Sequence, residues 1–180
     1  MSVAGSVSTW EQSVLAAVMS TGEGAVVSHH TAAFLHGLVE SRPERIEIST
    51  TKSYTPKRAW RIHRRHELPP SHRARKRGIA TTSVLRTLVD CVADGADAAA
   101  LLDTAGRLKL TRLAAAYEFL TGFAGRGRTG VPALLAEVEK RHRREGISES
   151  ELGSMFHRLL RDNDVRAPTP VSRLVAPTAH

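Results

Sequence analysis

Apolar residues recur at helical spacing near the start of the chain. Residues 8–20 open with Ser8 and Glu11, a capping-box pattern in which each side chain can bond the backbone N–H of the other residue, so a helix is expected there. A second, short helix is expected after Ser28, which is a suitable N-cap, and it should end near Gly37. The chain is therefore predicted to open with two helices.

The spacing of apolar residues then changes to a period of two. Ile46 and Ile48 alternate with polar residues, as do the apolar residues within 60–63, and this alternation is typical of half-buried strands. If the apolar positions of the second strand face the core, Arg61 and His63 point outward. The second strand is therefore expected to present a basic face to solvent.

Two prolines interrupt the segment that follows. Pro69 and Pro70 block both helix continuation and the hydrogen bonds of a strand ladder, so residues 66–77 are expected to form an irregular, exposed basic loop. A short strand over residues 78–83 should then lead into a helix that is capped by Ser83.

Helical spacing returns after this strand and continues almost to the end of the chain. Separate apolar stripes occupy residues 84–92, 98–108, 113–120 and 131–138. The strongest amphipathic pattern belongs to a last helix, Ser150 to Arg161, whose stripe consists of Leu152, Met155, Phe156, Leu159 and Leu160. Together these patterns predict an α+β fold, with a small mixed or antiparallel sheet packed against several helices and a mostly helical C-terminal half.

The composition is that of a globular protein. Of the 180 residues, 41% are hydrophobic, and no apolar run approaches the ~18 residues that a membrane span requires. The first residues lack the basic and apolar regions of a secretory signal, and the only cysteine, Cys91, cannot form an intrachain disulfide or a cysteine-based zinc cluster. We therefore expect a soluble, cytoplasmic protein with no membrane association.

The net charge of +8 is concentrated in one segment. Between Pro56 and Ala80 there is one acidic residue, Glu67, whereas the rest of the chain carries equal numbers of basic and acidic residues. Arginine forks suit phosphate oxygens, so this segment is predicted to contact nucleic-acid phosphates without reading sequence. The alternative is a charged sheet edge that merely prevents pairing with other chains. The predicted nucleic-acid-binding residues are Lys57, Arg58, Arg61, Arg64, Arg65, Arg73, Arg75, Lys76 and Arg77.

The histidines of the same segment do not form a recognisable metalloprotease motif. His63, His66 and Glu67 lack the second histidine four residues along a helix, so a solvated pair of histidines is expected and no metal site. Cys91 lies in a predicted apolar stripe and is expected in the core rather than as a nucleophile. Residues 124–130 contain glycines but lack the Gly-Lys-Ser/Thr ending of a phosphate loop. The sequence therefore predicts neither catalysis nor a cofactor.

Two further stretches resemble a known family. The first is carried by Ser28, His29, Ala32, Ala33, Gly37 and Leu38, and the second by Thr82, Arg86, Thr87, Leu88 and Asp90. Over roughly residues 8–140 the chain resembles the central region of AbiEi-type antitoxins of bacterial type IV toxin–antitoxin systems. In that family a winged helix-turn-helix usually precedes this region and reads DNA; only a few residues precede Ser8 here, so sequence-specific repression is not expected. Apart from the resemblance, Arg86 and Asp90 have the spacing of an ion pair on one helix.

The C-terminal residues have a second resemblance. Residues 148–170 look like the opening helix and turn of an endonuclease domain similar to very-short-patch-repair nucleases. Such domains hold Mg²⁺ with acidic residues on later strands, which this sequence does not reach, and Gly153 stands where relatives tend to have Glu. The resemblance divides the chain into an antitoxin-like α+β domain, 1–145, and a truncated nuclease-like segment, 146–180.

Three hypotheses for function follow. The leading one is a non-catalytic, antitoxin-like protein with a basic surface that faces nucleic acid. The second is a protein-interaction module that binds an acidic toxin partner. The third is an inactive remnant of a nuclease-linked protein. In each case the exposed stripe of the last helix would favour a homodimer, through Leu152, Met155, Phe156 and Leu159.

Overall fold

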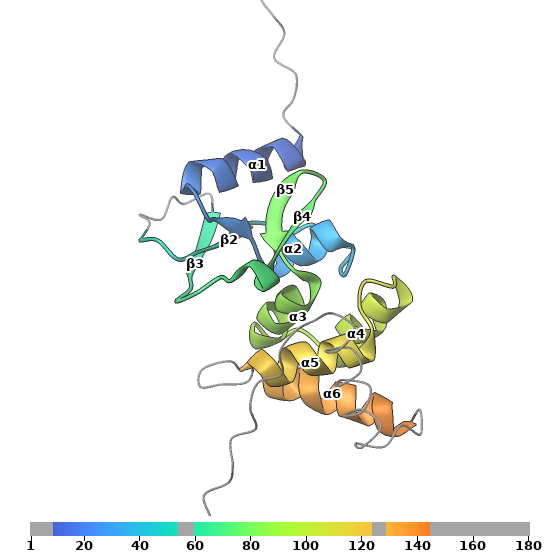
Figure 1. The fold of residues 1–180 in the computed structure, drawn as a ribbon. Coiled ribbons are helices and arrows are strands. Elements are labelled where there is room, and N and C mark those ends of the chain that lie inside the picture. The colour runs from blue at the N-terminus through green and yellow to red at the C-terminus, as the bar shows by residue number, and fades with distance from the viewer. Residues whose placement is uncertain (1–8, 54–59, 124–128, 145–180) are drawn as a thin grey trace, which may run out of the picture.

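The computed structural model describes residues 9–53, 60–123 and 129–144, and the predicted α+β class is confirmed. Figure 1 shows helix α1 on one side of a twisted sheet and the helices of the second half on the other side. The elements are α1 (Trp10–Thr21), β1 (Val26–Val27), α2 (His29–His36), β2 (Ile46–Thr50), β3 (Trp60–Arg64), a 3₁₀ turn (Pro70–His72), β4 (Arg73–Lys76), β5 (Ile79–Thr82), α3 (Val84–Ala93), α4 (Ala98–Arg107), α5 (Leu113–Phe123) and α6 (Gly130–Arg144).

The sheet is mixed and has the strand order β3-β2-β1-β5-β4. Strand β2 runs parallel to β3, and β1 runs parallel to β5, while the β1–β2 and β4–β5 pairs are antiparallel. Strands β3 and β4, which carry the described part of the basic segment, therefore lie at opposite edges of the sheet.

Strand β4 corrects the prediction of an irregular basic loop. The two prolines do not enter the ladder, because Pro70 opens a single 3₁₀ turn that ends at His72, before the strand begins. Strand β4 then pairs with β5 through a two-residue hairpin turn. Both turn residues, Arg77 and Gly78, have positive φ (49° and 79°), as the favoured two-residue hairpin turns require.

The first helix begins one residue later than predicted. Thr9, not Ser8, is the N-cap, and its reciprocal partner is Gln12. The caps predicted at Ser28, Gly37 and Ser83 are found, although Ser28 makes no side-chain cap bond. Strand β1 was not predicted, because two residues are too few to show a period of two.

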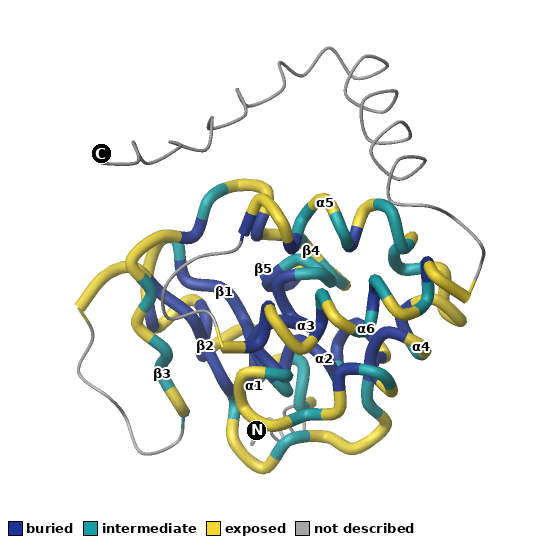
Figure 2. The backbone as a smooth tube through the Cα atoms, turned by 90° about the horizontal axis from the view of Figure 1, so that it is seen from below, coloured by how far each residue is buried: buried dark blue, intermediate teal, exposed yellow. Residues whose placement is uncertain are grey.

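Two apolar clusters form the core. Figure 2 shows buried backbone, in dark blue, along β1 and β2 and along α3. The first cluster joins α1 and α2 to the apolar face of the sheet, and Ile48 is fully buried there. The second lies among α3, α4, α5 and α6 and contains Cys91, which confirms the core position predicted for this residue. Burial raises the pKa of the Cys91 thiol, so the thiol stays protonated and unreactive.

Several predictions fall outside the described residues. These are Lys57, Arg58, Gly153, and the last helix with its proposed dimer stripe. Among the described helices, none combines the length and the apolar character that crossing a membrane would demand.

Candidate functional site

The basic segment is divided between two edges of the sheet. Arg61, Arg64 and Arg65 belong to the β3 edge, whereas Arg73, Arg75, Lys76 and Arg77 belong to the β4 edge. Four inter-strand spacings separate the two edges, which is ~19 Å along the sheet. Cations that are neighbours in sequence therefore form two separate surfaces.

Acidic side chains from other elements neutralise the β3 edge. Arg61 lies 3.5 Å from a carboxylate oxygen of Glu47 on β2 and 4.0 Å from one of Asp94 on α3. Arg65 donates to Asp90 of α3 at 2.9 Å. The expectation that the basic segment lacks compensating acids is therefore wrong for this edge. Arg64 is exposed and has no carboxylate within ion-pair distance in the described part of the chain.

The β4 edge keeps most of its positive charge. Arg73, Arg75 and Arg77 are exposed, and Lys76 is half-buried. Arg77 pairs with Glu11 at 3.3 Å in a solvent-exposed contact, and this is the one ion pair that the described residues provide for these four cations. Arg73 and Arg75 instead donate to the backbone oxygens of Leu68 and Gly78.

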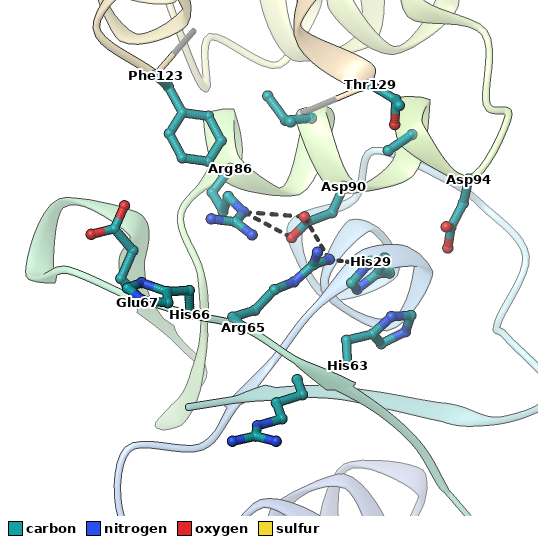
Figure 3. A pocket seen from close by; sticks show the side chains of 13 residues that line it. His29, His63, Arg65, His66, Glu67, Arg86, Asp90, Asp94, Phe123 and Thr129 are labelled. Atoms are coloured by element: carbon teal, nitrogen blue, oxygen red, sulfur yellow. Dashed lines mark hydrogen bonds and ion pairs between the residues drawn. The ribbon is translucent and has the colours of Figure 1, made fainter. Parts of the chain in front are cut away.

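A buried polar network joins α2, α3 and the end of β3. Asp90 accepts two bonds of 3.1 Å from Arg86 Nε, so the ion pair predicted on one helix is confirmed, and both side chains are almost fully buried. The Asp90 carboxylate also holds Arg65, whose Nη2 donates to His29 Nε2 at 2.6 Å (Figure 3). His29 Nδ1 in turn lies 2.8 Å from Ser28 Oγ. Four of the eleven residues that carry the family resemblance, Ser28, His29, Arg86 and Asp90, thus meet in one network.

Arg65 is the residue of this network that sequence reasoning misplaced. It was predicted on a phosphate-contacting edge, but its guanidinium group turns inward to Asp90 and His29. The period of two could have indicated this, because Arg61, His63 and Arg65 must share one face. That face is opposite the apolar one, as predicted, but it lies against α3 instead of open solvent.

His63 is also less exposed than predicted. Its ring stacks on the His29 ring with centroids 3.5 Å apart and an interplanar angle of 14°. His63 Nε2 lies 3.3 Å from Glu47 Oε1, and the side chain is only 15% exposed. His66 is exposed, so the predicted pair of solvated histidines is wrong for His63 alone.

The electrostatics of the network follow from burial. Burial, together with the nearby charges of His63, Arg65, Arg86 and Arg61, lowers the pKa of His29 to about 2, so this ring is neutral. Arginine can only donate, so His29 Nε2 is the acceptor and Nδ1–H donates to Ser28. Ser28 is fully buried, and its hydroxyl accepts from His29 Nδ1–H, so in this arrangement the ring does not take a proton from Ser28.

The two buried carboxylates respond differently to their surroundings. Burial raises the pKa of Asp90, and the guanidinium groups of Arg86 and Arg65 oppose this rise. Burial alone would also raise the pKa of Glu47, but hydrogen bonds from His63 and from the His30 backbone N–H hold it below its usual value. Glu47 therefore remains an ionised acceptor beneath the histidine pair.

A polar pocket of about 530 Å³ opens above the network. Figure 3 shows His66 and Glu67 on one side of it and His29, His63 and Asp94 on the other. Phe123 of α5 also lines this pocket. The pocket therefore combines imidazole, carboxylate and guanidinium groups within reach of solvent.

Comparison with known proteins gives no relative. No family model matches the chain, and no curated protein or solved structure shows significant similarity to it. Function must therefore be inferred from the side chains of this chain.

Proposed function

We propose that this chain is a non-catalytic, antitoxin-like protein that binds the phosphate backbone of nucleic acid through strand β4. The observation that supports this most is the exposure of Arg73, Arg75 and Arg77, which together with Lys76 have a single ion pair in the described residues, that of Arg77 with Glu11. Guanidinium groups form bidentate bonds with phosphate oxygens, and their charge is permanent.

The position of the arginines favours phosphate contact over base reading. Side chains two residues apart on a strand point to the same side, so Arg73 and Arg75 face one direction at a spacing of ~7 Å. A sequence-independent contact of this kind depends on counterion release, and its affinity falls steeply with salt. Four engaged cations would give a slope of log K against log salt of about −3.6.

The antitoxin-like part of the proposal rests on the sequence resemblance. Four of the residues that carry it, Ser28, His29, Arg86 and Asp90, lie in one hydrogen-bonded network and not on the basic edge. They would therefore maintain the fold while β4 makes the contact. No cofactor is needed for such binding.

An acidic protein partner, such as a toxin, is the second candidate. Among the described strands, β4 is the last of the sheet and pairs with β5 alone, so its other edge could pair with a partner strand as well as contact a phosphate chain. The same arginines would then contact carboxylates.

Fluorescence anisotropy with labelled 20-mer DNA and RNA of unrelated sequences tests the proposal. The full chain, in buffer with a chelator, should bind all of them with similar affinity and with the salt slope given above. Arg75→Gln/Arg77→Gln should weaken binding and make the slope shallower by about 1.8.

The matched control removes the same charge elsewhere. Arg107→Gln/Arg112→Gln changes two exposed cations of the helical half and should leave the slope within experimental error. Equal losses in the two double variants would show that net charge, not β4, drives binding. Absence of nucleic-acid binding, with capture of an acidic protein, would favour the second candidate.

A further inference from the structure

Three residues from different elements bring metal-binding atoms together at one side of the polar pocket. His29 begins α2, His63 lies on β3 and Asp94 follows α3, and one ligand atom from each lies within 4.8 Å of the other two. We propose that His29, His63 and Asp94 form a binding site for a divalent transition-metal ion of the Zn²⁺ class. This site is separate from strand β4 and does not depend on the proposed nucleic-acid contact.

Hydrogen bonds already orient both imidazole rings as ligands. Metal-binding histidines usually donate the second ring N–H to an oxygen acceptor, which fixes the ring and its tautomer. His29 donates from Nδ1 to Ser28 Oγ, which leaves the lone pair on Nε2. His63 Nε2 faces the Glu47 carboxylate at 3.3 Å, so Nδ1 is the ring nitrogen that this bond leaves for an ion. Ser28 and Glu47 therefore act as the outer partners of the two rings.

Small side-chain movements would bring the three ligands to bonding distance. In a tetrahedral zinc site the ligand atoms are about 3.4 Å apart, compared with an upper limit of 4.8 Å here. Asp94 is exposed at the end of α3, so its carboxylate can rotate without disturbing the core. A fourth position would remain for water from the pocket.

Without a metal ion, Arg65 donates a hydrogen bond to the nitrogen of His29 that would bind the ion. Its Nη2 donates to His29 Nε2 and to Asp90 Oδ1. Binding of a metal ion would break the first bond, and Arg65 would keep the second. The guanidinium group thus supplies the positive charge that the ion would otherwise bring.

The charged side chains around the site carry no excess of positive charge that would repel a dication. Three carboxylates, Glu47, Asp90 and Asp94, face three guanidinium groups, Arg61, Arg65 and Arg86, so the site is formally balanced without an ion. Imidazole ligands select Zn²⁺, Ni²⁺ or Co²⁺ over Mg²⁺, which prefers a shell of oxygen ligands. The sequence alone predicted no metal here, because the three residues are distant in the chain.

Isothermal titration calorimetry of the untagged full chain with ZnCl₂ tests the site. We expect one ion per chain, no competition from excess MgCl₂, and at least tenfold weaker binding after His63→Ala or Asp94→Asn. Asp94→Asn preserves the size of the side chain at a position outside the core, and its urea unfolding curve, compared with that of the original chain, separates loss of binding from loss of stability. Co²⁺ in place of Zn²⁺ should give the visible absorption of a tetrahedral centre.

Matched controls come from the opposite side of the same pocket. His66→Ala and Glu67→Gln alter an exposed imidazole and an exposed carboxylate and should leave zinc affinity within twofold of the original. The proposal is wrong if the original chain shows no zinc binding, or if His63→Ala and Asp94→Asn both retain it. Because DNA binding is measured in the presence of a chelator, its success or failure is independent of this result.

Discussion

Asp90 Oδ1 accepts a hydrogen bond from Arg65 Nη2 at 2.9 Å, across 25 positions of sequence. The same carboxylate is bound by Arg86, so one buried negative charge serves two guanidinium groups. This contact joins the end of strand β3 to helix α3, and it brings the sheet and the helical half together at the polar pocket.

Removal of the Asp90 carboxylate should strongly destabilise the fold. Asp90→Ala would remove the carboxylate that both Arg86 and Arg65 bind, and the loss of one partner of a buried pair costs about 3–5 kcal/mol. The free energy of unfolding in urea measures this. The control is Asp103→Asn, which breaks an ion pair with Arg141 in which Asp103 is 70% exposed, and it should cost less than about 1 kcal/mol. Similar values for the two variants would contradict the central role of Asp90.

The two basic edges should contribute unequally to nucleic-acid binding. Arg61→Gln/Arg64→Gln removes two cations from the β3 edge, where acids from β2 and α3 already lie close to Arg61. We expect this double variant to change the salt slope by less than half as much as Arg75→Gln/Arg77→Gln does. Anisotropy titrations at four salt concentrations distinguish the two variants. A larger change in salt slope for the β3-edge variant would contradict binding through β4 and would favour binding at the β3 edge beside the pocket.

Helix α6 should not tolerate a side chain at its first residue. A Cβ added to Gly130 would come within 2.2 Å of the backbone oxygen of Val89 on α3. Gly130→Ala must therefore separate α3 from α6, and such overpacking costs about 1–3 kcal/mol or more. Gly106→Ala, in α4, meets no atom within 4 Å and should instead stabilise the protein by about 0.5–1 kcal/mol. Thermal unfolding of the two variants should show shifts of opposite sign.

Stability should fall as the pH drops from about 6.5 to 5. Burial lowers the folded-state pKa of His36, and burial and neighbouring cations lower that of His29 to about 2. The unfolded chain therefore binds more protons than the folded chain below pH 6.5, and the stability present above this pH is lost on acidification. His29 alone would contribute a loss of about 2 kcal/mol at pH 5.

Urea unfolding at several pH values measures this slope. His36→Gln should make it shallower, because one buried neutral imidazole is removed. His66→Gln, at an exposed position, should preserve the slope. A stability that stays constant between pH 5 and 6.5 would refute the assignment of neutral, buried histidines.

Local patterns predicted most of the elements. The helices α3, α4, α5 and α6 follow their apolar stripes, and β2, β3 and β5 were expected from the period of two and from the segment before Ser83. The sequence does not predict strand β4, because it gives no sign of where the effect of Pro69 and Pro70 ends, whereas in the structure the 3₁₀ turn confines that effect. Residues 73–77 also lack the alternation of apolar and polar residues that predicts a strand, because their alternate, exposed positions are arginines.

The pocket could not be predicted because its lining residues come from elements that are distant in sequence and meet only in the folded chain. His29 and His63 stack although 34 positions separate them, and the parallel pairing of β2 with β3 places Glu47 within reach of His63. No spacing rule links an acid on β2 to a histidine on β3. Period-two reasoning gave the correct face for His63, but it gave no indication that α3 would cover that face.

Strand β1, only two residues long, lies at the centre of the sheet. Val26 and Val27 provide the register pairs to β2, and Val27 alone has a register partner in β5, Thr81. Strands β2 and β3 on one side of β1 are therefore joined to β5 and β4 on the other side through only two register pairs with β2 and one with β5. Amide protons at this seam should exchange with solvent through local opening before those of the β4–β5 hairpin, so the sheet would separate along its middle and not fray from its edges.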